Sequence, residues 1–256
     1  MCATARLGIL LTKLCNFQCS YCFSKCNNHL GKEELAIEKF ELIIKQLKAR
    51  GVKYVILSGG EPLLYRNIYQ VIEKLIYNSF EISLCTNAYY ASDEVCKKLH
   101  KLGLRKVTIS LDAIDKESFE DITNRSNTYD FVIKGISNFV NNDFMVTINT
   151  VVNNTDFKYF EKIISFSEQL GVTEVCFTIP VCKPVNINRI SKEKIGTIYK
   201  YLKQLDEKTK LKIEFNNPRC EIDDCPSNNY ILGVGVGGNI GECLVKSYMS
   251  IGVEDG

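Results

Sequence analysis

The regular alternation of β-rich runs and helical segments constrains the fold of this chain more than any other feature of its sequence. Six short runs rich in β-branched and other apolar residues are each followed by a segment whose apolar residues recur at helical spacing. The expected strands are residues 6–14, 53–58, 81–86, 105–111, 144–152 and 173–179, and the expected helices are residues 33–50, 67–78, 92–103, 129–141, 155–171 and 191–205. This order predicts an α/β fold with a parallel sheet and right-handed crossovers. We expect Ser92, Thr155 and Ser191 to cap three of the helices.

Six β-α units are fewer than the eight of a closed barrel, so we predict a partial (β/α)6 TIM-like barrel, with a doubly wound sheet as the alternative. The polar residues of two strands favour the barrel. Thr108, Ser110 and Asp112 share one face of the fourth strand, and Thr147 and Asn149 share one face of the fifth. A polar face on a parallel strand indicates that it lines a polar cavity, because a strand buried on both sides would be apolar on both. Chance alternation in a short strand is the alternative.

The β-α pattern ends after Lys210. Glycine becomes dense over residues 233–241, short β-rich runs replace helices, and three cysteines follow Lys210. We therefore expect two domains, a partial barrel over residues 1–208 and a small C-terminal cysteine-rich module over residues 209–256. The glycine-rich stretch is expected to form a hairpin.

Charge and hydropathy exclude several classes of partner. The 32 Lys and Arg residues nearly balance the 30 Asp and Glu residues, so no basic surface predicts binding to nucleic acid or to an anionic membrane. The longest uncharged apolar run near the start, residues 7–12, is too short for a signal peptide or a membrane span. We expect a cytoplasmic protein.

Twelve cysteines would suggest a disulfide scaffold in a small secreted domain, but here they are clustered in a large chain without an export signal. Clustered thiols in a cytoplasmic protein indicate metal ligands. Cys15, Cys19 and Cys22 form a C-x3-C-x2-C triad directly after the first expected strand. Three thiolates on one loop can hold a [4Fe-4S] cubane and leave one iron open. Zinc is the alternative, but it needs a fourth ligand, and His29 is in poor register.

The triad, with Tyr21 just before its last cysteine, resembles the signature of the radical S-adenosylmethionine (SAM) superfamily. A second match is Gly59-Gly60-Glu61-Pro62 after the second expected strand, where the family has a GGEP motif. The resemblance implies that the open iron binds the amino and carboxylate groups of SAM, and that Glu61 accepts from the SAM ammonium. It also implies that glycine at 59 and 60 lets the backbone approach the ligand.

Weaker matches extend the resemblance over about residues 6–180. Thr86 begins a Thr-Asn-Ala sequence, Ser110 begins Ser-Leu-Asp, and Arg125 resembles a family arginine that faces the SAM carboxylate, with a solvated loop cation as the alternative. The cofactor-binding residues expected from the resemblance are Tyr21, Gly59, Gly60, Glu61, Thr86, Ser110, Arg125 and Asn149. No catalytic residue is assigned.

A second cysteine group, Cys220, Cys225 and Cys243, follows the pattern C-x4-C-x12-G-x4-C. It resembles the SPASM and shorter twitch modules, which hold an auxiliary iron-sulfur cluster, with zinc as the alternative. No cysteine follows Cys243, so a fourth ligand would come from upstream, with Cys182 as the first choice, or from the substrate, or would be absent. Cys85, Cys96 and Cys176 are expected to be buried apolar residues.

The resemblance implies an oxidoreductase-like enzyme that cleaves SAM reductively to a 5′-deoxyadenosyl radical, which abstracts hydrogen from the substrate. It also implies an electron donor such as flavodoxin or ferredoxin. We expect a peptide substrate, as in ribosomal peptide maturation. The alternatives are a small-molecule oxidoreductase of the twitch type and a non-catalytic iron-sulfur carrier or redox sensor.

Overall fold

The computed structural model describes residues 6–22, 33–152, 154–180, 190–216, 232–238 and 240–241. Its strands are β1 (Arg6–Leu10), β2 (Tyr54–Ser58), β3 (Glu81–Thr86), β4 (Lys106–Ser110), β5 (Met145–Val151), β6 (Glu174–Thr178), β7 (Lys212–Asn216), β8 (Leu232–Val234) and β9 (Ile240–Gly241). Its helices are α2 (Phe40–Ala49), α3 (Ile68–Tyr77), α4 (Asp93–Lys101), α5 (Lys116–Thr123), α6 (Tyr129–Asn141), α7 (Phe157–Gln169) and α8 (Lys192–Asp206), with 3₁₀ turns η1 (Ile37–Lys39) and η2 (Pro62–Leu64).

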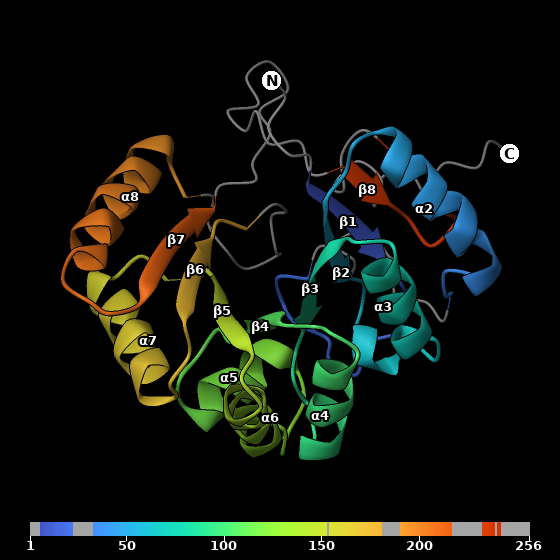
Figure 1. The fold of residues 1–256 in the computed structure, drawn as a ribbon. Helices are drawn as coiled ribbons and strands as arrows, with labels where there is room; N and C mark the ends of the chain where they lie inside the picture. Colours follow the sequence, from blue (N-terminus) through green and yellow to red (C-terminus); the bar gives the residue numbers. More distant parts are fainter. Residues whose placement is uncertain are drawn as a thin grey trace, which may run out of the picture.

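These strands form one curved, open sheet in the order β7-β6-β5-β4-β3-β2-β1-β8-β9. Neighbours from β7 through to β8 pair in parallel, and only β8 and β9 pair antiparallel. The strands line the inside of an arch and the helices cover its outside (Figure 1). The predicted partial barrel is therefore confirmed. The two ends of the sheet do not meet, so the barrel stays open.

The segment after Lys210 adds strands to both ends of this sheet. β7 pairs with β6, whereas β8 pairs with β1 at the other end. The predicted hairpin is present, because Val234 of β8 pairs with Ile240 of β9. The boundary proposed near residue 208 remains a prediction. Among the described residues, the part beyond it is joined to the barrel by strand pairing.

The sheet buries one face and half-exposes the other. In β4, Val107 and Ile109 are buried whereas Thr108 is half-buried and Ser110 exposed. β5 shows the same alternation, with Asn149 on the less buried side. The buried residues pack against the helices, and the polar residues face the inside of the arch. This is the polar inner face that the sequence predicts.

The helix expected over residues 33–50 is shorter than predicted. α2 begins at Phe40, after the η1 turn. Residues 33–35 are instead extended against the segment after β1, because Lys13 N–H donates to Glu33 O at 2.9 Å and Leu35 N–H donates to Leu11 O at 2.8 Å. A helical periodicity does not reveal backbone groups that pair elsewhere in the fold.

Two predicted caps are confirmed and one is displaced by a residue. The Ser92 and Ser191 hydroxyls accept from the first turns of α4 and α8. α7 is capped by Asp156, not by Thr155. α5 was not predicted. It is an eight-residue helix with only Phe119 and Thr123 buried, so its apolar periodicity is too short to recognise.

Within the part of the chain that the structure describes, no helix combines the length and apolar character that a membrane span needs.

Candidate functional site

The three triad cysteines lie on the segment that leaves β1, here called the cysteine loop (residues 15–22). Cys15, Cys19 and Cys22 are each partly buried and not in disulfides. Burial raises the pKa of Cys15 to about 11 and that of Cys19 still further. Electrostatic repulsion from Cys22 adds to the rise of both pKa values. Both thiols therefore keep their protons at neutral pH until a metal displaces them. Among the described residues, no three His, Cys, Asp or Glu side chains lie close enough together to hold one metal ion.

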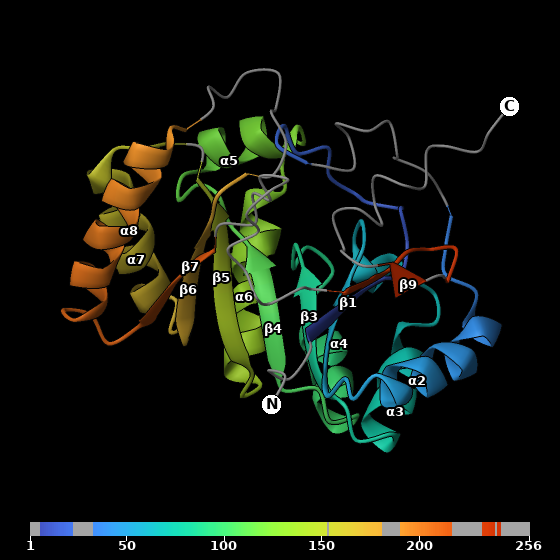
Figure 2. The ribbon, with the colours of Figure 1, turned by 90° about the horizontal axis from the view of Figure 1, so that it is seen from above.

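The end of α5 holds the cysteine loop in place. Backbone N–H groups of Gln18 and Ser20 donate to the carbonyls of Thr123 and Ile122 at 3.0 and 2.9 Å. The Asn124 side chain, just beyond the helix, returns a bond of 2.9 Å to Gln18 O. Figure 2 shows α5 at the same end of the sheet as this loop. The unpredicted helix therefore supports the predicted metal loop.

The glycine turn after β2 packs on the segment just before Cys15. Gly60 N–H donates to Thr12 O at 2.7 Å, and Glu61 N–H donates to Leu14 O at 2.8 Å. A Cβ atom on Gly60 would lie 2.2 Å from Leu14 O, and one on Gly59 would lie 2.6 Å from Thr12 O. The structure therefore adds a second explanation for glycine at both positions. Besides the expected approach of the backbone to a ligand, glycine allows two backbone segments to approach each other closely.

Glu61 connects the ends of two strands. Its carboxylate is 1% exposed and accepts from Leu63 N at 2.9 Å, from Thr86 Oγ1 at 2.6 Å and from Asn87 N at 2.7 Å. Burial raises the pKa of Glu61, and the three donors oppose this shift. Thr86 is thus brought to Glu61, as the predicted site requires. Both side chains already have partners within the protein.

Asn16, which the sequence reasoning did not single out, lies next to Cys15. Its Oδ1 accepts from Asn87 Nδ2 at 2.8 Å, and the Arg125 guanidinium donates to its backbone carbonyl. Its Nδ2 is one of two buried side-chain N or O atoms among the described residues with no hydrogen-bond partner. The signal available from sequence was only its place directly after the first cysteine.

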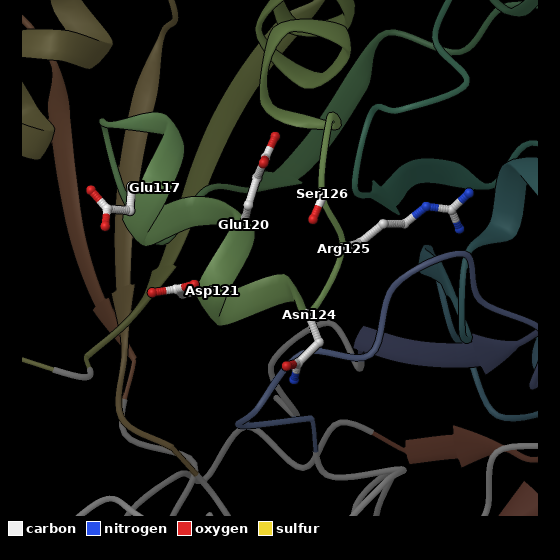
Figure 3. A pocket seen from close by; sticks show the side chains of 6 residues that line it. All are labelled: Glu117, Glu120, Asp121, Asn124, Arg125 and Ser126. Atoms are coloured by element: carbon white, nitrogen blue, oxygen red, sulfur yellow. The ribbon is translucent and has the colours of Figure 1, made fainter.

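Arg125 lies beside the cysteine loop through its bond to Asn16, and its guanidinium carbon lies 5.6 Å from the centre of the Tyr89 ring. It borders a shallow pocket lined by Glu117, Glu120, Asp121, Asn124, Arg125 and Ser126. In Figure 3 its side chain points away from Glu117 and Asp121. The cation is therefore directed toward Tyr89 and the cysteine loop, not into this acidic pocket.

Tyr21 reaches across to the end of β4. Its hydroxyl donates to Oδ2 of Asp112, and Oδ1 of Asp112 accepts from Val151 N at 2.6 Å. Asp112 is 2% exposed, and burial raises its pKa to about 6 against the effect of these two donors. Tyr21 is therefore brought to the site through a side-chain bond that the sequence did not predict.

The remaining predicted residues occupy neighbouring strand ends. Ser110 is paired in register with Asn149. Asn149 Oδ1 accepts from Thr178 Oγ1 at 2.6 Å, whereas Ser110 is exposed. Predicted site residues thus gather at the carboxyl ends of β1 to β5, where parallel β/α barrels place their chemistry.

Cys220, Cys225, Cys243 and Cys182 lie outside the described residues. Of the three cysteines expected to be buried, only Cys96 is fully so. Cys85 and Cys176 are half-buried because both lie on the inner face of an open sheet. Burial raises the pKa of Cys85 to about 12 and that of Cys176 to about 11.

Comparisons with known proteins agree with this geometry. A family model described as the Radical SAM superfamily matches residues 9–167. A probable GTP 3′,8-cyclase of Saccharolobus islandicus is 30% identical over 223 residues, which cover 83% of this chain and 69% of the relative. A GTP 3′,8-cyclase of Clostridium perfringens is 36% identical over 150 residues, covering 57% of this chain and 46% of the relative.

Among solved structures, Streptococcus suis SuiB bound to the precursor peptide SuiA matches with a TM-score of 0.79 at 17% identity. The match covers 100% of this chain and 62% of SuiB, so the chain spans less than two thirds of that protein. At this level of identity the likeness concerns the fold.

Proposed function

This chain belongs to the radical SAM superfamily, and on that premise we propose that Cys15, Cys19 and Cys22 hold the [4Fe-4S] cluster that the family implies. When bound, the cluster would supply the electron for reductive cleavage of SAM, and SAM would supply the 5′-deoxyadenosyl radical that abstracts hydrogen from the substrate. The observation that carries the proposal is the position of the three thiols on one loop, supported on one side by the glycine turn and on the other by α5.

The residues around the loop fit these groups chemically. Three thiols suit a cubane that leaves one iron for SAM. The buried Asn16 Nδ2 is a donor without a partner, and such an atom costs about 1–3 kcal/mol unless an acceptor reaches it. The Arg125 guanidinium is bonded to the same residue. An amide donor beside a cation suits a carboxylate, the group that SAM presents.

Each side chain then has a role toward SAM. Arg125 and Asn16 would bind the carboxylate. Glu61, which three donors already fix, would accept from the ammonium. Ser110 and Asn149 lie on the inner face and offer a hydroxyl and an amide to the polar edge of the nucleoside. The apolar outer face of the sheet, packed on its helices, keeps these groups rigid.

Two substrate classes are proposed. A peptide is expected from the resemblance of the C-terminal cysteine pattern to SPASM and twitch modules, and the auxiliary cluster on Cys220, Cys225 and Cys243 remains part of this proposal. A small molecule is the second candidate, favoured by the relatives named as GTP 3′,8-cyclases at 30% identity over most of the chain.

The test is anaerobic reconstitution with iron and sulfide, followed by reduction with dithionite in the presence of SAM. We expect 5′-deoxyadenosine in the chromatogram of the wild-type reaction and none above background with Cys15, Cys19 and Cys22 all replaced by Ala. A variant with Cys96→Ala is the control, since this thiol is buried behind the sheet. Equal amounts of 5′-deoxyadenosine from the triple variant and the wild type would overturn the assignment.

A second experiment distinguishes the two substrate classes. It measures deuterium transfer from labelled peptides or labelled nucleotides into 5′-deoxyadenosine.

A further inference from the structure

We propose that Gly135 of α6 is a positioning residue for SAM binding. Its lack of a side chain lets the turn after β3, residues 87–91 and here called the asparagine turn, lie where it supports Asn16 and Arg125. The inference rests on the proposed function, in which those two side chains bind the SAM carboxylate. It assigns a role to a helix residue that belongs to none of the motifs in the sequence.

Gly135 packs directly on the backbone of Ala88. A Cβ atom at position 135 would lie 2.1 Å from Ala88 O and 3.2 Å from Ala88 Cβ. Ala88 is fully buried and has a φ of +60°, in the left-handed region that residues with a Cβ atom rarely adopt. Such a conformation persists only where the surrounding structure holds it. A side chain at position 135 would therefore displace the turn.

Three residues of α6 at helical spacing hold the asparagine turn. Phe131, Gly135 and Asn138 share one face of the helix, because residues three and four positions apart are neighbours on its surface. The centres of the Phe131 and Tyr89 rings are 5.2 Å apart. The buried Asn138 amide donates to Ala91 O at 2.8 Å. One face of α6 therefore contacts the turn at its middle and at its end.

The asparagine turn supports both residues proposed for the carboxylate. Asn87 Nδ2 donates to Asn16 Oδ1 at 2.8 Å, and Asn87 Oδ1 accepts from Tyr89 N at 3.0 Å. The Tyr89 ring contacts Phe17 of the cysteine loop edge to face, with ring centres 6.0 Å apart. The Arg125 guanidinium lies over the same Tyr89 ring. A shift of the turn therefore moves the supports of the amide and of the cation together.

The cysteine loop has further supports that do not involve α6. The N–H groups of Gln18 and Ser20 donate to carbonyls at the end of α5, and the glycine turn packs on the segment before Cys15. Displacement of the asparagine turn leaves these bonds in place. We therefore expect a side chain at position 135 to weaken SAM binding while the protein keeps its cluster.

The experiment compares Gly135→Ala with Gly196→Ala after anaerobic reconstitution. Both glycines are in helices, so alanine adds the same helix propensity at each, but a Cβ at position 196 meets nothing within 4 Å. Calorimetric titration with SAM should give a dissociation constant about tenfold higher in Gly135→Ala, the loss expected for one misplaced charge-assisted bond. Gly196→Ala should bind SAM as the wild type does, and both variants should keep wild-type iron content.

Hydrogen exchange supplies a readout that needs neither cluster nor SAM. The backbone N–H of Asn87 donates to the buried Glu61 carboxylate at 2.7 Å, so this amide should be protected from exchange. It should exchange faster in Gly135→Ala and at the wild-type rate in Gly196→Ala. Wild-type SAM affinity and wild-type exchange at Asn87 in a folded Gly135→Ala would overturn the proposal.

A second substitution in the turn separates positioning from a general loss of packing. Glycine adopts the left-handed conformation freely, so Ala88→Gly lets the backbone at position 88 yield to a side chain at position 135. The double variant should therefore recover part of the lost SAM affinity. No recovery would place the effect of Gly135→Ala elsewhere in α6 and contradict the positioning role.

Phe131→Ala decides the matter if Gly135→Ala does not fold. Phe131 is 56% exposed, so its removal costs little packing, yet its ring supports Tyr89. We expect weaker SAM binding in Phe131→Ala and wild-type binding in Tyr199→Ala, a control on α8 that is 50% exposed. Wild-type affinity in Phe131→Ala would then overturn the inference. Failure of the wild-type protein to bind a cluster or SAM would contradict the proposed function instead, so the two failures are distinct.

Discussion

The backbone N–H of Asn87 donates to the Glu61 carboxylate at 2.7 Å, and this bond joins the ends of β2 and β3. The Asn87 side chain continues the connection to Asn16 in the cysteine loop at 2.8 Å. A carboxylate in the glycine turn is thus linked through one asparagine to the residue beside Cys15. Hydrogen bonds thus connect Glu61, Thr86 and Asn87 to Asn16, the residue beside the first predicted cluster ligand.

Glu61→Ala should destabilise the fold as well as the site. The substitution leaves three donors, Leu63 N, Thr86 Oγ1 and Asn87 N, without their buried acceptor. Each unsatisfied buried group costs about 1–3 kcal/mol, so we expect a clear loss of the free energy of unfolding in urea. Exposed Glu73→Ala on α3 is the control. Stability equal to that of the wild type would show that the network contributes little.

Arg125→Ala should weaken SAM binding without removing the cluster. A lost charge-assisted contact of about 1.5–3 kcal/mol corresponds to about ten- to hundredfold in affinity. SAM titration followed by the EPR signal of the cluster measures this. Arg105→Ala is the matched control, because Arg105 bonds to His100 O and Leu104 O before β4 begins. Normal SAM affinity in Arg125→Ala would make this arginine a loop cation that supports Asn16.

Gly60→Ala should displace the cysteine loop. The added Cβ would lie 2.2 Å from Leu14 O, a backbone atom that cannot move without its segment. We expect a loss of about 1–3 kcal/mol in the free energy of unfolding and a lower iron content after reconstitution. In contrast, a Cβ at Gly196 on α8 meets nothing within 4 Å, so Gly196→Ala should raise stability by about 0.5–1 kcal/mol. Full iron content in Gly60→Ala would show that the loop tolerates the shift.

Lys212→Met should make stability more sensitive to pH. Lys212 pairs with Glu174 at 3.4 Å and contacts Glu214 on the same inner face. Burial, followed by the charge of Glu214, raises the pKa of Glu174 above its usual 4.5. A raised pKa of an acid adds stability at low pH that is lost as pH rises through the folded-state value. Without the lysine this loss should grow. Between pH 4.5 and pH 7 the free energy of unfolding in urea should therefore change further toward instability in Lys212→Met than in the wild type. Lys101→Met on α4 should show no such change.

Replacing Cys220, Cys225 and Cys243 by Ala should remove about four irons, the content of one cubane, while uncoupled SAM cleavage survives. The expectation comes from their spacing, since the three residues lie outside the described part of the chain. Metal analysis of the Cys15/Cys19/Cys22 triple variant is the complementary measurement. Stoichiometric zinc and no iron in that protein would make the second group a structural zinc site.

Local sequence alone determined the order of the six expected β-α units, the buried outer face and two of three helix caps. Apolar periodicity in β4, with Val107 and Ile109 buried, and the capping hydroxyls of Ser92 and Ser191 depend on neighbours a few residues away. The spacing of Cys15, Cys19 and Cys22 is likewise local, so the cluster loop could be predicted without a structure.

Tertiary structure decided what surrounds that loop. The bond between Tyr21 and Asp112 joins residues 91 positions apart, and the support from α5 joins Gln18 to Thr123. The positions of β7 and β8 at opposite ends of the sheet were equally beyond prediction from periodicity. Such contacts depend on strand register, on the curvature of the sheet and on where each chain segment leaves its strand. No short stretch of sequence carries that information, because these distances are set by the packing of the whole barrel.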